Sequence, residues 1–96
     1  MNKFKNKLTK AIMLCEIERG NREKGIYGES SIEQLGMIIT ELNQLLNLVE
    51  KGNLPVCSKR FLNSFANAFT VWGWNMQSPT ELFVLLTEIN NEYKNL

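Results

Sequence analysis

The chain of 96 residues contains no histidine and no aspartate, so all ten of its acidic residues are glutamates. The absence of histidine excludes the Ser-His-Asp and Cys-His arrangements that activate a nucleophile, and it excludes every metal site built on imidazole. The sequence also lacks a glycine-rich phosphate loop, zinc-ligand spacing and a calcium-binding loop. We therefore expect a protein without enzymatic activity, without a small-molecule substrate, and without a metal or cofactor.

Cysteines and long apolar runs are also scarce. Cys15 and Cys57 are too few for a zinc cluster or for the disulfide framework of a small secreted protein, so we expect buried, reduced thiols. The apolar run after the basic start covers only residues 11–15, which is shorter than the core of a signal peptide. No run approaches the roughly 18 residues of a membrane-spanning helix. The sequence therefore predicts a cytoplasmic protein.

The apolar residues, 44% of the chain, recur at helical spacing, and with a net charge of +1 they predict one soluble helical domain over residues 1–96. A first helix is predicted over residues 3–23. Ser30 and Glu33 form a capping box that predicts the start of a second helix, and Gly52 predicts its end. The apolar face of this second helix consists of Leu35, Ile38, Leu42, Leu45 and Val49.

Two further helices are predicted after Gly52. Pro55 suits a first helical position, so the third helix is predicted from there to Gly73. Ser78 as the N-cap, with Pro79 and Glu81 after it, predicts a fourth helix that runs nearly to the terminus. No segment alternates with period two for long enough to predict a strand. Four helices with short connections predict an all-α fold, an antiparallel up-and-down four-helix bundle.

Charge is predicted to separate along this bundle, because both chain ends and the connection after Gly52 lie at one end. Most basic residues, including Lys10, are assigned to that end, and most glutamates, including Glu81, to the other. The lysines of the first helix could contact nucleic acid or an anionic membrane, but they lack interleaved arginines and aromatic stacking residues. We therefore expect a solvated lysine face, and no nucleic-acid or membrane partner.

The aromatic residues concentrate in the segment 61–80, twenty consecutive residues without a formal charge. Phe61, Phe65 and Phe69 are spaced four apart, which predicts a buried stripe on one helical face. Trp72 and Trp74 flank Gly73 at a turn, where both side chains cannot easily point inward. An exposed Trp74 would be a good anchor for a partner protein, because tryptophan offers a large rigid area and one hydrogen-bond donor.

The bundle topology brings Tyr27 to the same end as the two tryptophans, with glutamates around them. The predicted partner-binding residues are Tyr27, Glu29, Glu33, Trp72, Trp74 and Glu81. Aromatic residues surrounded by acids favour an interface for a basic partner surface. The alternative is that the aromatic rings close the end of the bundle while the glutamates stabilise helix N-termini.

Two segments resemble those of a known family. One is Ser31-Ile32-Glu33-Gln34-Leu35 with the following Ile38 and Leu42, and the other is Ser78-Pro79-Thr80-Glu81-Leu82, which restarts the last helix. In these segments and in length the chain is similar to the small all-helical bacterial immunity proteins, in particular those against type VI toxins that hydrolyse NAD. The resemblance implies a cytoplasmic, non-enzymatic protein that binds one cognate toxin domain and occludes its active site.

A self-associating helical adaptor or regulatory protein is the alternative function. It is suggested by the apolar spacing from Leu35 to Val49, which also suits a pair of helices from two copies. The sequence leaves both a monomer and a homodimer open.

Overall fold

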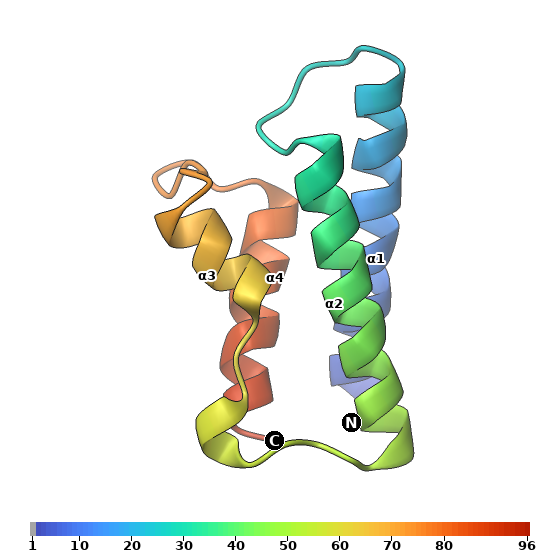
Figure 1. Cartoon of the computed structure of the whole chain (residues 1–96), viewed down its shortest axis with the longest axis vertical. Helices are drawn as coiled ribbons and strands as arrows, with labels where there is room; N and C mark the ends of the chain where they lie inside the picture. The colour runs from blue at the N-terminus through green and yellow to red at the C-terminus, as the bar shows by residue number, and fades with distance from the viewer. Residues whose placement is uncertain (1) are drawn as a thin grey trace.

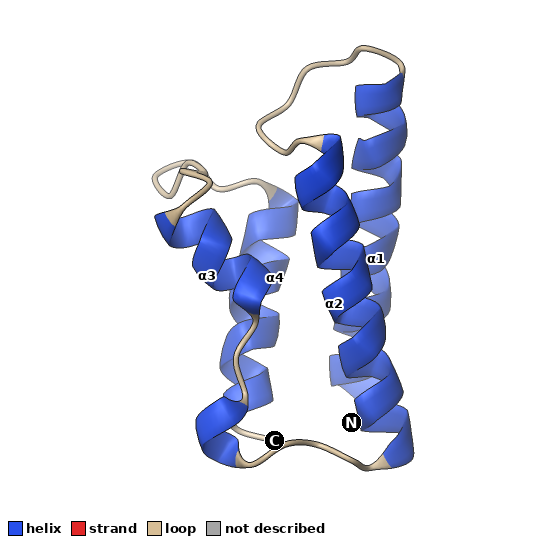
Figure 2. Ribbon diagram, in the orientation of Figure 1, coloured by secondary structure: helices blue, strands red, loops and turns tan. Residues whose placement is uncertain are grey.

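The computed structural model describes residues 2–96, apart from the side chains of Asn2, Cys57 and Phe69. The thiol of Cys57 and the ring of Phe69, both expected to be buried, therefore lie outside the described part of the chain. The elements are α1 (Asn2–Glu23), α2 (Ile32–Lys51), a 3-10 turn η1 (Cys57–Lys59), α3 (Asn63–Thr70) and α4 (Glu81–Lys94). Residues 2–96 contain no strand (Figure 2), so the predicted all-α class is confirmed.

The three long helices lie along the longest axis of the molecule, and α3 is short and tilted (Figure 1). Helix α1 packs against α2 and α4, and α3 packs against the same two helices. Both chain ends and the first part of the connection 52–62 lie at one end of the molecule, and the connection then rises beside α4 to α3 (Figure 1). Helix α4 starts well below the loop that joins α1 to α2, because it has 14 residues and α1 has 22.

Helix α2 begins one residue later than the sequence predicts. Its N-cap is Ser31, whose Oγ accepts a hydrogen bond from the Gln34 backbone N–H (3.1 Å), while Gln34 Oε1 accepts from the Ser31 N–H (3.1 Å). The predicted box of Ser30 and Glu33 is therefore wrong. Ser30 is buried, and its carbonyl accepts a hydrogen bond from Arg22. The predicted end is confirmed, since Gly52 has the left-handed conformation (φ +69°).

Helix α3 does not begin at Pro55 but at Asn63, and it ends at Thr70, before Gly73. Its N-cap residue, Leu62, offers no side-chain oxygen, so the free backbone N–H groups are satisfied from other helices. Glu41 of α2 accepts from the N–H groups of Asn63 (2.7 Å) and Ser64 (2.8 Å). The buried Asn90 of α4 accepts from the Leu62 N–H (2.8 Å). Side chains distant in sequence therefore set the start of this helix.

Helix α4 starts at Glu81, and its N-cap is Thr80 rather than the predicted Ser78. Thr80 Oγ1 accepts a hydrogen bond from the Phe83 N–H (3.2 Å). Pro79 therefore stands before the cap and not in the first helical turn. The prediction of a helix here is confirmed, and the cap is two residues later.

The core lies between α1, α2 and α4. The predicted face of α2, from Leu35 to Val49, is entirely buried, so the feature that suggested self-association is used within the chain. The predicted phenylalanine stripe is wrong for Phe61, which is 49% exposed, and Phe65 is half-buried. No helix within residues 2–96 is long and apolar enough to cross a bilayer.

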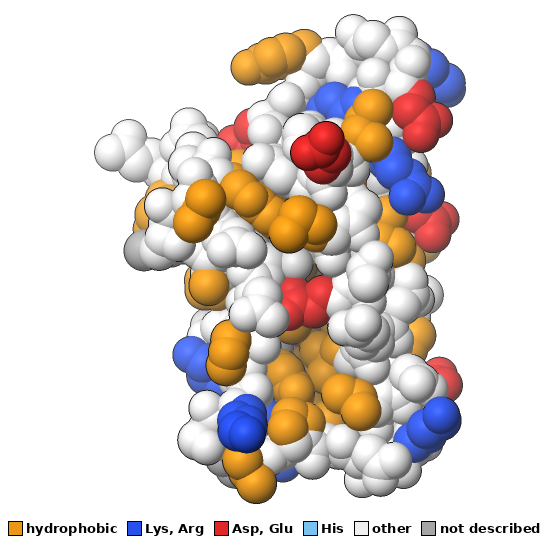
Figure 3. All heavy atoms as spheres, viewed as in Figure 1, with side chains coloured by type: hydrophobic (Ala, Val, Ile, Leu, Met, Phe, Trp, Pro, Cys, Tyr) orange, Lys and Arg blue, Asp and Glu red, His pale blue; other side chains and the backbone are white. Residues whose placement is uncertain are grey.

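The predicted separation of charge fails where α1 meets α4. The Lys10 Nζ atom lies 3.1 Å from Glu81 Oε1, although these residues were assigned to opposite ends of the bundle. Lys7 pairs with Glu88 (3.3 Å) and also with Glu92. The short α4 places its first turn beside the middle of α1, which explains the error. On the face shown in Figure 3, acidic and basic side chains both occur near the upper end.

Candidate functional site

Arg22, in the last turn of α1, holds the loop that joins α1 to α2. Its Nε donates to the Ser30 carbonyl (2.7 Å) and its Nη1 to the Ile26 carbonyl (3.3 Å). Its Nη2 pairs with Glu18 Oε2 (2.7 Å), one helical turn earlier. The Arg22 side chain is only 12% exposed. A guanidinium with three partners fixes the loop conformation, and it is thereby engaged within the chain.

Gly28 is required for this close approach of loop and arginine. A Cβ atom at position 28 would lie 1.7 Å from Arg22 Nη2 and 2.2 Å from Cζ. Long arginine side chains usually move aside at little cost, but this one is held by Glu18, Ile26 and Ser30. A side chain at position 28 would therefore displace the group that orders the loop.

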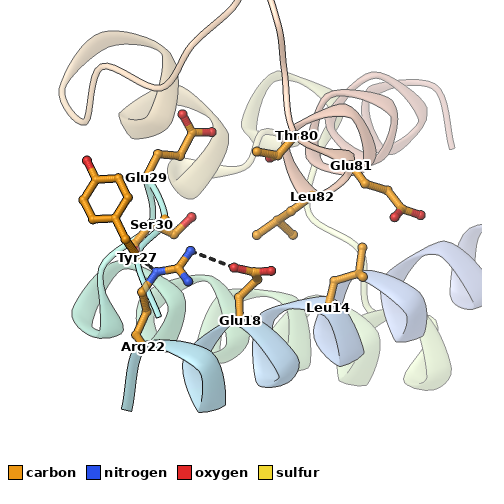
Figure 4. Close-up of a pocket in the computed structure, with 10 residues that line it drawn as sticks. Leu14, Glu18, Arg22, Tyr27, Glu29, Ser30, Thr80, Glu81 and Leu82 are labelled. Carbon is orange, nitrogen blue, oxygen red and sulfur yellow. Dashed lines mark hydrogen bonds and ion pairs between the residues drawn. The ribbon is translucent and has the colours of Figure 1, made fainter. Parts of the chain in front are cut away.

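Next to this loop lies a cleft of about 220 Å³, which we call the acidic cleft. It is lined by Leu14, Glu18, Arg22, Tyr27, Gly28, Glu29, Ser30, Thr80, Glu81 and Leu82. Figure 4 shows Tyr27 and Glu29 on one side, Thr80 and Glu81 on the other, and Leu82 between them. The lining contains three carboxylates and one guanidinium, so its formal charge is negative.

Each carboxylate of the acidic cleft also has a contact within the protein. Glu18 pairs with Arg22, and Glu81 pairs with Lys10 on the exposed surface. Glu29 accepts a hydrogen bond from the Asn75 N–H (3.2 Å), which ties the α1–α2 loop to the α3–α4 loop. A carboxylate has several lone pairs, so one contact leaves capacity for a donor from a partner.

Tyr27 is the most prominent side chain of the site. It is 94% exposed, and in Figure 4 its ring projects at the edge of the acidic cleft. The preceding Ile26 is also exposed. Two large apolar side chains on a loop fixed by Arg22 can enter a partner surface without first losing loop entropy. This residue of the predicted site therefore lies where a partner can reach it.

Trp74 is not an exposed anchor, and this part of the predicted site is wrong. It is 3% exposed, its Nε1 donates to Gln34 Oε1 (3.3 Å), and it stands edge-on to Phe83 with ring centroids 5.5 Å apart. The half-buried Trp72 packs against Trp74, with the ring centroids 5.6 Å apart. Gly73 adopts φ +67°, a turn that allows both neighbouring rings to pack inward.

Glu33 lies outside the acidic cleft, in the first turn of α2. It is exposed and lines a neighbouring hollow together with Tyr27 and Glu29. The structure therefore brings Tyr27, Glu29 and Glu81 to one cleft, places Glu33 beside it, and buries Trp74 with Trp72 half-buried against it.

Sequence reasoning missed Glu18 and Arg22 as parts of the site. A signal for them exists, since a glutamate four residues before an arginine on a helix predicts an ion pair. Nothing local predicts that the same arginine also binds two carbonyls of the following loop. That arrangement depends on how the loop returns to α2.

Cys15, expected from the sequence to be a buried thiol, is fully buried in α1. Burial raises the pKa of its thiol to about 12, so it is protonated at neutral pH. The structural role expected for this cysteine is consistent with that environment. Among the described side chains, no three cysteines or glutamates are grouped as metal ligands would be.

No family model, curated protein or solved structure matches this chain. The fold and the site therefore have to be interpreted from their own geometry. They define a small all-helical protein with one fixed, aromatic-tipped loop beside a cleft of negative charge.

Proposed function

We propose that this chain is a small cytoplasmic immunity or inhibitor protein that neutralises a cognate toxin domain by binding it. The observation that carries the proposal is Tyr27, fully projecting from a loop that Arg22 fixes beside the acidic cleft. An exposed aromatic side chain on a preorganised loop is typical of binding hot spots. Enzymatic activity is not part of this proposal.

The chemistry of the site selects a basic partner surface. Tyr27 offers an aromatic face for a lysine or arginine, and Glu18, Glu29 and Glu81 supply carboxylates on the opposite and adjoining walls. Complementary charge also accelerates association and disfavours acidic partners. The active-site entrance of an enzyme that binds an anionic substrate presents this kind of basic rim.

The four helices, in this proposal, form an antiparallel up-and-down bundle in which α3 is shortened. In support, α1 and α3 each pack against both α2 and α4, and the chain ends share one end of the molecule. A bundle of this kind is a rigid support for the α1–α2 loop, which lies at the opposite end.

The proposal is tested with the product of the neighbouring gene, by calorimetry and by survival of cells that express that product. We expect a stoichiometric complex, protection of the cells, and an affinity that falls as salt rises. Tyr27→Ala should weaken binding by about 2–4 kcal/mol with little effect on folding.

Met13→Ala is a matched control, because Met13 is exposed on α1 and does not line the acidic cleft. It should leave the affinity unchanged. Absence of both binding and protection would contradict the proposed function. A complex that is insensitive to Tyr27→Ala would instead place the interface on another surface.

A further inference from the structure

The acidic cleft is too small to form the whole of a tight protein–protein interface. A stable interface buries about 800 Å² on each partner and involves about 20–30 residues a side. The acidic cleft is lined by ten residues. A toxin domain that binds at Tyr27 therefore has to continue its contacts from the cleft onto a neighbouring surface.

Two further hollows continue directly from the acidic cleft. The first, of about 510 Å³, lies along the α1–α2 loop and shares Tyr27 and Glu29 with the cleft; we call it the loop hollow. The second, of about 690 Å³, lies over α2 and α3 and shares Glu33 with the first; we call it the α2–α3 hollow. The loop hollow adds five residues to the ten of the cleft and the α2–α3 hollow adds ten more, so the three form a continuous surface of 25 residues.

Exposed apolar side chains mark the same direction. Ile32, 44% exposed, lines the loop hollow, and Met37, 52% exposed, lines the α2–α3 hollow. Figure 3 shows apolar side chains gathered where the upper parts of α2 and α3 adjoin. The apolar cavity between α3 and α4, lined in part by Phe83 and Val84, shares no lining residue with the cleft or with either hollow. The surface that extends the cleft therefore runs over the loop to α2 and α3.

The α2–α3 hollow differs from the acidic cleft in charge. Its charged lining residues are Arg19, Glu33 and Glu41. Both carboxylate oxygens of Glu41 already accept hydrogen bonds, from the N–H groups of Asn63 and Ser64. Arg19 offsets Glu33, so this hollow presents no excess of free carboxylate to a basic side chain.

Uncharged amide groups line the α2–α3 hollow where carboxylates line the cleft. Among the described residues, nothing hydrogen-bonds the side-chain amides of Gln44, Asn63 and Asn67. Each amide offers an acceptor oxygen and two N–H donors, and the peptide groups of an extended chain present the same two functions. Met37 adds a flexible apolar side chain that adapts to irregular surfaces. The hollow therefore fits an uncharged extended segment better than a charged side chain.

We propose that the toxin domain makes two chemically different contacts, an extension that rests on the proposed function. A basic side chain of the toxin enters the acidic cleft. An extended, uncharged segment of the toxin lies in the α2–α3 hollow, where its peptide groups pair with Asn63 and Asn67 and an apolar side chain packs on Met37. Charges in the cleft act at a distance and set the association rate, whereas the desolvated contacts at Met37 set the dissociation rate.

Surface plasmon resonance at several salt concentrations, with the full chain and the toxin domain from the neighbouring gene, separates the two contacts. Met37→Ala should raise the dissociation rate constant, and with it Kd, at least about tenfold. The association rate constant and its salt dependence should stay unchanged. Asn63→Ala and Asn67→Ala should each raise Kd about 2–10-fold. Glu29→Gln should instead lower the association rate constant and flatten its salt dependence.

Met13→Ala is the matched control for Met37→Ala. Met13 is 53% exposed, almost the same as Met37, and it lines neither the cleft nor the two hollows. Val84→Ala is a second control, in the cavity between α3 and α4. Neither change should alter Kd, and circular dichroism checks that each variant is folded.

A complex that tolerates both Met37→Ala and Asn67→Ala would overturn the second contact. The proposed function would still stand if Tyr27→Ala weakened that complex. A loss of affinity for Val84→Ala with none for Met37→Ala would place the extension between α3 and α4. An effect of Met37→Ala on the association rate alone would contradict the division between the two contacts. Absence of any complex would remove the proposed function, and the second contact with it.

Discussion

At the scale of single residues, Gln34 and Trp74 show how one polar atom can join two parts of the chain. Gln34 Oε1 accepts from its own N-cap residue, Ser31, and from the indole N–H of Trp74. The indole N–H therefore has a hydrogen-bond acceptor in the interior. Without it, burial of the ring would leave this donor unpaired.

Trp74→Ala is expected to destabilise the fold by about 3–5 kcal/mol, because it removes a buried ring and leaves a cavity beside Phe83. Urea denaturation followed by circular dichroism measures the change. Trp72→Ala should cost less, since Trp72 is only half-buried. A loss for Trp74→Ala no larger than that for Trp72→Ala would contradict the burial of Trp74 against Phe83.

Cys15 gives a prediction about pH. Its pKa is raised by burial from 9.0 to about 12, so the unfolded thiol ionises before the folded one. The contribution of Cys15 to the free energy of unfolding should be fully present below pH 9.0. It should be lost progressively as the pH rises from there to about 12.

Denaturant titrations at a series of alkaline pH values measure this loss in a Cys57→Ser background. Cys15→Ala in the same background is the control, because it removes the thiol while other groups continue to titrate. The free energy of unfolding should fall more steeply with pH when Cys15 is present than in the Cys15→Ala protein. Equal slopes for the two proteins would show that burial does not hold the thiol protonated.

At the scale of elements, α3 is the helix that depends most on its neighbours. It has eight residues, its N-cap residue has no capping side chain, and its first backbone donors bind Glu41 and Asn90. A helix this short is marginal alone, so its position follows from α2 and α4.

Glu41→Ala should destabilise the protein by about 0.5–2 kcal/mol, the usual cost of losing an N-terminal cap. Thermal denaturation measures it. Glu16→Ala, a change at an exposed glutamate of α1, is a matched control that should have little effect. Equal stability of the two variants would mean that the Glu41 carboxylate does not hold the start of α3.

At the scale of the whole molecule, the helix pair α1–α2 is joined to the pair α3–α4 by contacts that cross between the two pairs. Trp74 reaches α2 through Gln34 and α4 through Phe83, and Lys7 and Lys10 link α1 to α4. The lysine pairs are at least partly exposed and contribute little, so the connection rests on the apolar core between α1, α2 and α4, which includes Trp74.

Unfolding should therefore be cooperative, with the same denaturant midpoint for tryptophan fluorescence and for the helical circular dichroism signal. Both tryptophans lie in the cluster that joins the pairs, so fluorescence reports on their separation. A fluorescence midpoint clearly below the circular dichroism midpoint would show that α1 and α2 survive after α3 and α4 detach.

Three of the four helices could be located from the sequence, and the buried face of α2 was predicted residue by residue. Periodicity and end signals such as Gly52 act within a few residues of one another, so they are visible in the chain itself. The start of α3, the burial of Trp74 and the pairing of Lys10 with Glu81 were missed. Each of these depends on which helices become neighbours and on where α4 begins.

The sequence by itself determined an all-helical chain without histidine chemistry and with Tyr27 in a connecting loop. The tertiary structure alone decided which side chains cap α3, which rings are buried, and that Arg22 fixes the loop. The reason is physical: Arg22 meets the Ser30 carbonyl only where the loop returns to α2, and the other deciding bonds join residues 22 to 40 positions apart, as in Glu41 with Asn63 and Gln34 with Trp74. Such partners meet only after packing has brought their helices together.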